Sequence, residues 1–294
     1  MSTSQLLKAR FEADGFVVVP GLVPTGSMQP LQIACADVVA RTRAGEWPHR
    51  RTVGKQFPPY GDADPDSWGV QHVMHPALGE AQKAFTKWYT SDEVVGAVRT
   101  LLGCAEEELQ MELFNLLINP VAHDFALRWH RDDIPNEATA EEELAALDAW
   151  KPYGIQWNTA LYTDACLYVV PGSHKVPRST DQRKLSRGME APENPLDMPG
   201  SIQVVLQPGE SVFYNSNILH CAAYNSKAQR ATLHATMGTV AGGAVRARNI
   251  LQHGLGWMKE PQFAAGLDER GQAMLGRLIA LYDAKGEVGY SLDG

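Results

Sequence analysis

The segment ALRWHRDDIP, residues 126–135, places His130 and Asp132 two residues apart near the end of a predicted strand. Side chains at positions i and i+2 of a strand leave the same face, so both can reach one ion, whereas Arg131 must point away. Asp133 has the opposite parity, and we expect it to be a capping or surface residue. The spacing predicts a metal site, although an isolated pair of this kind also occurs as a hydrogen-bonded strand end without metal.

A third ligand is predicted from a later strand, where the segment NSNILHCAAYN contains His220. Two histidines and one carboxylate on one face of an octahedral ion leave three positions open, which is the arrangement typical of non-haem Fe(II) oxygenases. We therefore predict that His130, Asp132 and His220 bind Fe(II) and leave room for a bidentate co-substrate and oxygen.

Arg230 follows His220 by ten residues in the segment NSKAQRATLHATMG. If residues 225–229 form a hairpin loop, Tyr224 lies opposite Arg230, and the even-numbered residues of both strands face the same side. A guanidinium can hold a carboxylate through two hydrogen bonds, which suits the far end of 2-oxoglutarate. Arg230 is the predicted co-substrate residue; the alternative is a surface ion-pair partner.

Periodicity divides the chain into a helical first third and a β-rich remainder. From about residue 109, short runs of strand formers alternate with turn residues, as in an all-β sandwich or barrel. The predicted strands are 109–118, 124–131, 154–163, 165–170, 201–207, 210–216, 218–224 and 230–239. The predicted helices are 4–14, 27–43, 77–89, 91–102, 137–149 and about 268–285.

Two further features bear on domain organisation. The polar stretch 175–200 lacks obvious structure, and we interpret it as a candidate lid. No internal repeat or separating linker is visible, so we expect one domain over residues 1–294, in which the helical N-terminal third buttresses a β core at about 109–240.

Composition limits the classes of partner. The chain carries 26 Lys plus Arg against 34 Asp plus Glu, a net charge of −8 that opposes binding to nucleic acid. Its four cysteines are scattered, which indicates reduced thiols in a cytosol-like compartment. No secretory signal and no run of 18 apolar residues is present, so we expect a cytoplasmic protein with no membrane partner.

The sequence resembles the phytanoyl-CoA dioxygenase-like family of Fe(II)- and 2-oxoglutarate-dependent oxygenases over most of residues 7–240. The resemblance begins with FEADGFVVVPGLVP at 11–24, continues through WHRDD at 129–133 and CLYVVPGSH at 166–174, and ends with His220 and Arg230. A His and Asp pair with the spacing of His130 and Asp132 is common by chance. The four motifs together, in this order, are a much more specific indication of the family.

This resemblance implies a mainly β fold with flanking helices, a double-stranded β-helix (jelly-roll, cupin-like) barrel. It also implies Fe(II) on the residues matching His130, Asp132 and His220, and a 2-oxoglutarate carboxylate on the residue matching Arg230. The chain departs from the family where Asp164-Ala165 replaces the Asn-Gly of many relatives, and where Leu127 replaces a Gln. We choose Asn158 as a second co-substrate contact because WNTAL resembles the strand that often contributes one.

The run RTRAGEWPHRRTVGKQFPPYG at 41–61 combines basic and aromatic residues. A solvated basic loop is the default interpretation. The functional alternative is a flap that attracts an anionic substrate, such as a carboxylate or a CoA ester. Trp68 and Gln71 just beyond are the predicted substrate-binding residues.

The combined prediction is a dioxygenase that oxidises a small organic molecule with Fe(II), O2 and 2-oxoglutarate, and ascorbate is the expected reductant in vitro. Hydroxylation is the default outcome, with desaturation or rearrangement as alternatives, and natural-product biosynthesis is favoured over fatty acyl-CoA oxidation. A homodimer is compatible with the sequence. Two other classes stay open: a non-redox cupin-like isomerase or lyase, which gives Arg230 no task, and a non-catalytic barrel that binds a small ligand.

Overall fold

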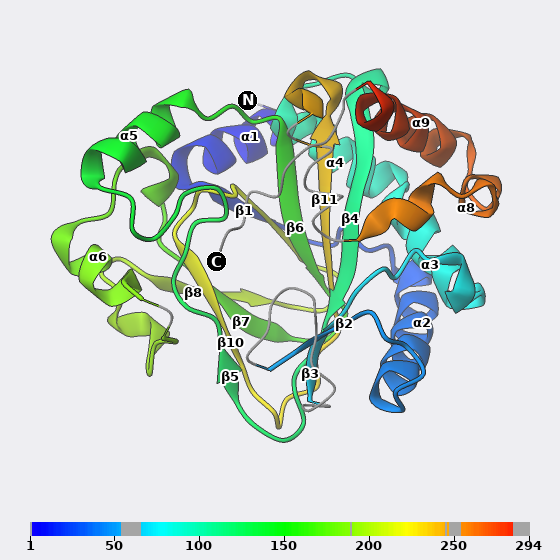
Figure 1. The fold of residues 1–294 in the computed structure, drawn as a ribbon, viewed down its shortest axis with the longest axis horizontal. Coiled ribbons are helices and arrows are strands. Elements are labelled where there is room, and N and C mark those ends of the chain that lie inside the picture. Colours follow the sequence, from blue (N-terminus) through cyan, green and yellow to red (C-terminus); the bar gives the residue numbers. More distant parts are fainter. Residues whose placement is uncertain (1, 54–65, 189, 245, 247–253, 285–294) are drawn as a thin grey trace.

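Two antiparallel sheets pack against each other at the centre of the computed structural model, which describes residues 2–53, 66–188, 190–244, 246 and 254–284 (Figure 1). The larger sheet has the strand order β1-β9-β6-β11-β4-β3-β2, and the smaller has the order β5-β10-β7-β8. The predicted mainly β jelly roll with flanking helices is confirmed. The described ladders do not join the two sheets, so the barrel is not closed.

The larger sheet consists of β1 (Phe16–Val19), β9 (Ser211–Tyr214), β6 (Gly154–Ala160), β11 (Thr232–Thr239), β4 (Leu109–Leu117), β3 (Ser67–Val70) and β2 (Arg50–Thr52). The smaller sheet consists of β5 (Phe125–Ala126), β10 (His220–Tyr224), β7 (Asp164–Val169) and β8 (Ile202–Leu206). The strand predicted at 124–131 is wrong in extent, because regular pairing covers only two residues before an isolated bridge at His130. The first three strands were not predicted, because that part of the chain was interpreted as helical.

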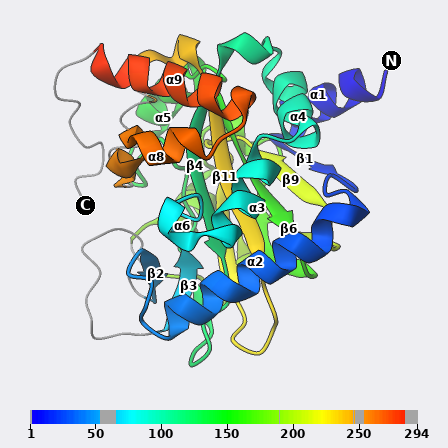
Figure 2. The ribbon, with the colours of Figure 1, turned by 90° about the vertical axis from the view of Figure 1, so that its right-hand side faces the viewer.

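Helices cover the outer face of the larger sheet (Figure 2). They are α1 (Thr3–Asp14), α2 (Thr25–Arg43), α3 (Glu80–Tyr89), α4 (Asp92–Leu102), α8 (Pro261–Ala265) and α9 (Glu269–Asp283). The helix predicted at 91–102 is confirmed as α4: Ser91 Oγ accepts a hydrogen bond from the Val94 N–H, and Gly103 ends the helix at a φ of 69°. Two more helices lie beside the smaller sheet in Figure 1, α5 (Ala140–Ala149) and α6 (Thr180–Ser186).

Short 3-10 turns complete the described elements. They are η1 (Pro76–Leu78), η2 (Glu106–Glu108), η3 (Ser173–Lys175), η4 (Pro195–Asp197), η5 (Val240–Gly242) and η6 (Leu255–Lys259). None of the described helices is both long and apolar enough to cross a membrane.

Strand parity divides the larger sheet into an apolar outer face and a partly polar inner face. On β6 and β9, the paired residues Trp157 and Phe213 are buried in the core that includes residues of the covering helices. The register places Asn158 opposite both His234 and Val212. Because directly paired residues share a face, Asn158 and His234 lie between the two sheets with Val212. The functional side chains therefore have a common interior to point into.

The predicted hairpin between residues 218–224 and 230–239 is wrong. β10 pairs with β5 and β7, whereas β11 pairs with β4 and β6, so residues 225–231 cross from one sheet to the other. The side chains nevertheless meet between the sheets, where the guanidinium carbon of Arg230 lies 4.8 Å from the ring centroid of Tyr224. Tyr224 and Arg230 therefore face the same side because the two sheets pack together, and not because their strands pair with each other.

The described residues of the stretch 175–200 form more regular structure than we expected, and the role of this stretch as a lid stays a prediction. Its described residues include α6 and η4, and two of its arginines bind the buried carboxylate of Glu143 on α5. Arg178 Nε donates to Glu143 Oε1 at 3.0 Å, and Arg183 Nη2 donates to Oε2. Part of the basic run, residues 54–61, lies outside the described residues. The single domain stays an expectation.

Candidate metal centre and co-substrate site

His130 and His220 lie directly opposite each other across an antiparallel bridge. Each backbone N–H donates to the carbonyl of the other residue at 3.0 Å, and the two ring centroids are 4.3 Å apart. Directly opposed residues present their side chains on the same face of the paired segments. The smaller sheet therefore brings two imidazoles together that are 90 residues apart in sequence.

Both imidazoles are oriented by backbone carbonyls. His130 Nδ1 lies 2.8 Å from the Arg128 carbonyl, and His220 Nδ1 lies 2.9 Å from the Ile218 carbonyl. A carbonyl oxygen can only accept, so Nδ1 carries the proton and Nε2 presents a lone pair. Burial, together with the nearby His130, lowers the pKa of His220 to about 4. The neutral imidazole that a metal requires is therefore the form present at pH 7.

Asp132 completes the donor set. Its Oδ1 lies 3.5 Å from His130 Nε2 and 3.7 Å from His220 Nε2, and one ligand atom from each residue falls within 4.8 Å of the others. Burial raises the pKa of Asp132. His220, His130 and a hydrogen bond from Gln156 together lower this pKa by more, so that it lies well below its usual range. The two imidazole Nε2 atoms and Asp132 Oδ1 each offer an electron pair, and they lie close to one another. A divalent cation requires such a set of donors.

Gln156 on β6 is a member of this site that our sequence prediction missed. Its Nε2 donates to Asp132 Oδ2 at 2.5 Å, which leaves Oδ1 facing the histidines. The missed signal was strand parity, because Gln156 and Asn158 are two residues apart on one strand and share its inner face.

Asp133 and Arg131 point away from the metal centre, as predicted from parity. The carboxylate of Asp133 accepts hydrogen bonds from Trp150 Nε1 at 3.2 Å and Ser216 Oγ at 2.8 Å. Arg131 is buried on the opposite side, where its Nε donates to Glu143 Oε1 at 2.7 Å. The guanidinium also donates to backbone carbonyls, including that of Ser173 at 2.8 Å, and so fixes the backbone between the two ligands.

Arg230 is buried between the sheets and only partly satisfied. Its Nε donates to Asp164 Oδ2 at 3.0 Å, while its Nη1 is buried and has no hydrogen-bond partner among the described residues. Asp164 also accepts from the Cys166 N–H at 2.9 Å and from the Thr232 hydroxyl. Burial raises the pKa of Asp164, but Arg230 and Thr232 lower it more, so the carboxylate stays ionised. An orphaned guanidinium donor in a buried site fits a bound carboxylate.

Asn158 lies on the inner face of β6 between the levels of the metal centre and Arg230. Gln156, two residues before it, contacts Asp132, and Ala160, two residues after it, pairs with Thr232 near Arg230. Its Oδ1 lies 2.8 Å from His234 Nδ1. A molecule that spans the distance from the metal centre to Arg230 would pass Asn158.

A family model for phytanoyl-CoA dioxygenase matches residues 11–232, more than half of the chain. The match includes all three proposed metal ligands and Arg230. The chain belongs to the phytanoyl-CoA dioxygenase family. This family membership makes it an enzyme of the non-haem iron, 2-oxoglutarate-dependent oxygenase class, as the sequence predicted. No curated protein matches the chain.

Solved structures support the fold. AviO1 from Streptomyces viridochromogenes matches with a TM-score of 0.59 and 16% identity, over 82% of this chain and 98% of that one. EctD from S. alaskensis, solved with 2-oxoglutarate and 5-hydroxyectoine, matches with a TM-score of 0.56 and 16% identity, over 82% of this chain and 77% of that one. The non-heme alpha ketoglutarate dependent epimerase SnoN from nogalamycin biosynthesis matches with a TM-score of 0.52 and 17% identity, over 81% of both chains. At this identity the likeness establishes the shared fold.

Within this member of the phytanoyl-CoA dioxygenase family, both predicted substrate residues are buried. Trp68 is fully buried and packs against Tyr224 and Phe125, and its Nε1 donates to the Thr52 carbonyl at 2.8 Å. Gln71 follows the end of β3, where its carbonyl accepts from Trp47 Nε1 at 3.0 Å. The structure gives Trp68 a packing role, and substrate binding by either residue stays a prediction.

Proposed function

We propose that the protein is an Fe(II)- and 2-oxoglutarate-dependent dioxygenase that hydroxylates a small organic molecule. The single observation that carries this proposal is the convergence of His130 Nε2, His220 Nε2 and Asp132 Oδ1 on one point. Two imidazoles and one carboxylate form the facial donor set that suits non-haem Fe(II) and leaves adjacent positions open.

Bound iron, together with 2-oxoglutarate and O2, supplies the oxidation of a carbon–hydrogen bond and releases succinate and carbon dioxide. The protein's residues hold and orient the participants. The carbonyls of Arg128 and Ile218 fix the two imidazoles, and Gln156 fixes the carboxylate of Asp132. Preorganisation of this kind avoids rearranging the donors when the metal binds.

Arg230 is the proposed partner of the far carboxylate of 2-oxoglutarate. Its unpaired Nη1 offers a charge-assisted hydrogen bond, and Asp164 holds the guanidinium in place through Nε. Asn158 is the proposed second contact, because its amide lies between Arg230 and the metal centre. A non-redox isomerase gives no task to the orphaned guanidinium, and a simple binding barrel gives none to the assembled His130, Asp132 and His220.

The proposed substrate is a small molecule of natural-product biosynthesis. Support comes from the named role of SnoN in nogalamycin biosynthesis, together with a fold that is common to all three relatives. O2 and 2-oxoglutarate are the proposed co-substrates and ascorbate the proposed reductant in vitro. We propose a cytoplasmic location from the scattered cysteines.

The test is formation of succinate from 2-oxoglutarate by purified protein with Fe(II) and ascorbate, with and without O2. Oxygen-dependent succinate is expected with wild type, increased by a substrate from a panel of polyketides, sugars and amino-acid derivatives. The matched variants are His130→Ala, which loses a ligand, and His123→Ala, which removes an exposed histidine. Absence of succinate under all conditions, with iron affinity equal in wild type and His130→Ala, would show that the proposed function is wrong.

A further inference from the structure

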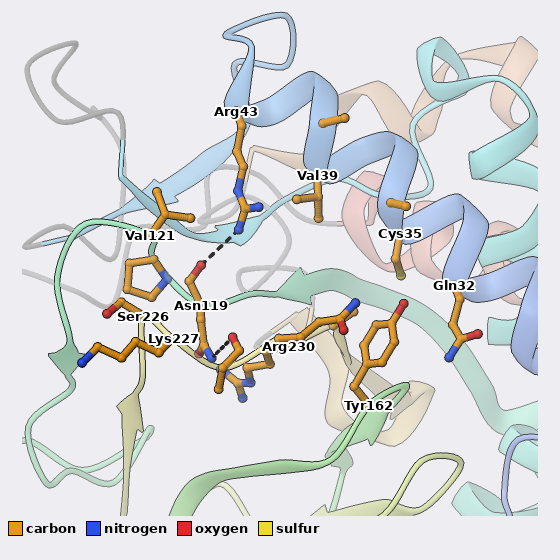
Figure 3. Close-up of a pocket in the computed structure, with 16 residues that line it drawn as sticks. Gln32, Cys35, Val39, Arg43, Asn119, Val121, Tyr162, Ser226, Lys227 and Arg230 are labelled. Carbon is orange, nitrogen blue, oxygen red and sulfur yellow. Dashed lines mark hydrogen bonds between the residues drawn. The ribbon is translucent and has the colours of Figure 1, made fainter.

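A cavity of about 470 Å³ lies between α2 and the crossing segment 225–231 (Figure 3). Residues 119–121, which follow β4, and Tyr162, which follows β6, complete its wall. A volume of this size is typical of pockets for small organic ligands. None of the three proposed metal ligands lines it.

One face of α2 forms the apolar side of this pocket. The lining positions 32, 35, 36, 39, 40 and 43 recur at helical spacing, so they share one side of the helix. Cys35, Ala36, Val39 and Ala40 supply apolar surface, whereas Gln32 and Arg43 stand at opposite ends of the stripe, as Figure 3 shows for the labelled residues. An occupant of this face therefore has an apolar body.

The charge of the pocket has one sign. Arg43 and Lys227 line it together with Arg230, and none of its described lining residues is acidic. Arg43 Nη2 donates to the Asn119 carbonyl at 3.4 Å, and this partner is neutral. Within the described part of the chain, the ion pairs include neither Arg43 nor Lys227. Figure 3 shows both cations at the end of the pocket near Val121, away from Tyr162 and Gln32.

We infer that this pocket binds a small organic carboxylate with an apolar body, at a site separate from the metal centre. The carboxylate end pairs with Arg43 and Lys227, and the apolar body lies along Val39 and Cys35. Two cations beside a mainly apolar wall suit a single carboxylate better than a polyphosphate, which would need more donors. Arg230 contributes to the border of the pocket, but its Nε is directed to Asp164, inside the sheets.

The two sites are connected through the residue that borders both. A ligand that displaces the 225–231 segment would also move Arg230, the proposed co-substrate residue. Coupling of this kind is reciprocal, so a carboxylate in the pocket and 2-oxoglutarate at the iron would change each other's affinity by the same factor. This consequence rests on the proposed function, whereas the binding itself does not.

The test measures hexanoate binding to the full-length protein by calorimetry and by two-dimensional NMR, with uncharged hexanamide as the comparison. Hexanoate is expected to bind saturably and hexanamide at least about tenfold more weakly, because the charge-assisted contacts are lost. The variant Arg43→Gln/Lys227→Gln should weaken hexanoate by about tenfold or more. The matched variant Lys184→Gln/Arg187→Gln, which changes the net charge equally at exposed positions, should bind as wild type.

Two further variants keep the result interpretable. Ala36→Trp fills the pocket from an exposed helix position, so it should abolish hexanoate binding without loss of the fold. His130→Ala should bind hexanoate as wild type does, because the pocket does not include the metal centre. The inference would be overturned if hexanoate did not bind saturably, or if hexanamide bound equally well. It would also be overturned by wild-type affinity in Arg43→Gln/Lys227→Gln or in Ala36→Trp, or by loss of hexanoate binding in His130→Ala. None of these outcomes depends on succinate formation.

Discussion

The side-chain amide of Gln156 donates to Oδ2 of Asp132 at 2.5 Å and thereby turns the other carboxylate oxygen toward both histidines. Only Gln156 belongs to a sheet strand. Gln156 lies on β6 of the larger sheet, and Asp132 follows the bridge that joins His130 to β10 of the smaller one. The geometry of the metal centre therefore depends on how the two sheets pack.

Replacing Gln156 with Leu should weaken Fe(II) binding by about tenfold, because partners of metal ligands typically contribute 10–100-fold to affinity. Anaerobic iron titration measures this effect, and unchanged circular dichroism establishes that the fold is retained. The control is Gln207→Leu, which makes the same change at an exposed position after β8. Equal iron affinity in Gln156→Leu and wild type would remove Gln156 from the site.

Asp132→Ala and Asp133→Asn should differ sharply in iron binding. Loss of the carboxylate ligand is expected to weaken Fe(II) binding by at least about 100-fold, more than the loss of a ligand's partner. Asp133→Asn should keep near wild-type affinity, because its side chain contacts Trp150 and Ser216 and not the histidines. The reverse order of affinities in the same titration would assign the ligand to Asp133.

Arg230→Gln should raise the concentration of 2-oxoglutarate that half-saturates succinate formation by roughly 10–100-fold, the usual effect of losing a hydrogen bond to a charged group. Iron affinity should be unchanged, because Arg230 contacts Asp164 and not the metal ligands. Arg187→Gln, which removes an exposed cation outside both proposed carboxylate sites, serves as the control at saturating iron. Unaltered dependence on 2-oxoglutarate would show that another residue holds its carboxylate.

The ion pair between Asp164 and Arg230 should make stability depend on pH in acid. The net pKa of Asp164 is lowered in the folded state, so its stabilising contribution is complete above the unfolded value of about 3.9 and is lost as pH falls through the folded value. Urea unfolding of wild type and Asp164→Asn from pH 6 to pH 3 measures the difference. Wild type should be more stable at pH 6, with the gap narrowing below pH 4; parallel curves would contradict this assignment.

Glu143→Gln should destabilise the protein by about 3–5 kcal/mol, the usual cost of breaking a buried ion pair by removing one partner. The carboxylate is fully buried and interacts with Arg131, Arg178 and Arg183. The free energy of unfolding from urea titration measures the effect. Glu141→Gln, at an exposed position of the same helix, should leave that free energy nearly unchanged.

The local part of the metal centre could be predicted from sequence, because side-chain direction along a strand has a fixed period of two. That period separates Asp132 from Arg131 and Asp133, and the order of His130, His220 and Arg230 along the chain matches one family. The spacing of strand formers and turns predicted a β sandwich or barrel, and the family resemblance implied the jelly roll. These properties depend on neighbouring residues and motif order alone.

Only the tertiary structure decided which strands lie side by side. The sequence suggested a hairpin of residues 218–224 with 230–239, but the two strands belong to different sheets, because pairing depends on long-range packing that a short loop does not determine. The same packing brings Gln156 to Asp132 and Asp164 to Arg230, contacts that span 24 and 66 residues. Residue types and parity determined the available donors, and the packing of two sheets determined which of them meet.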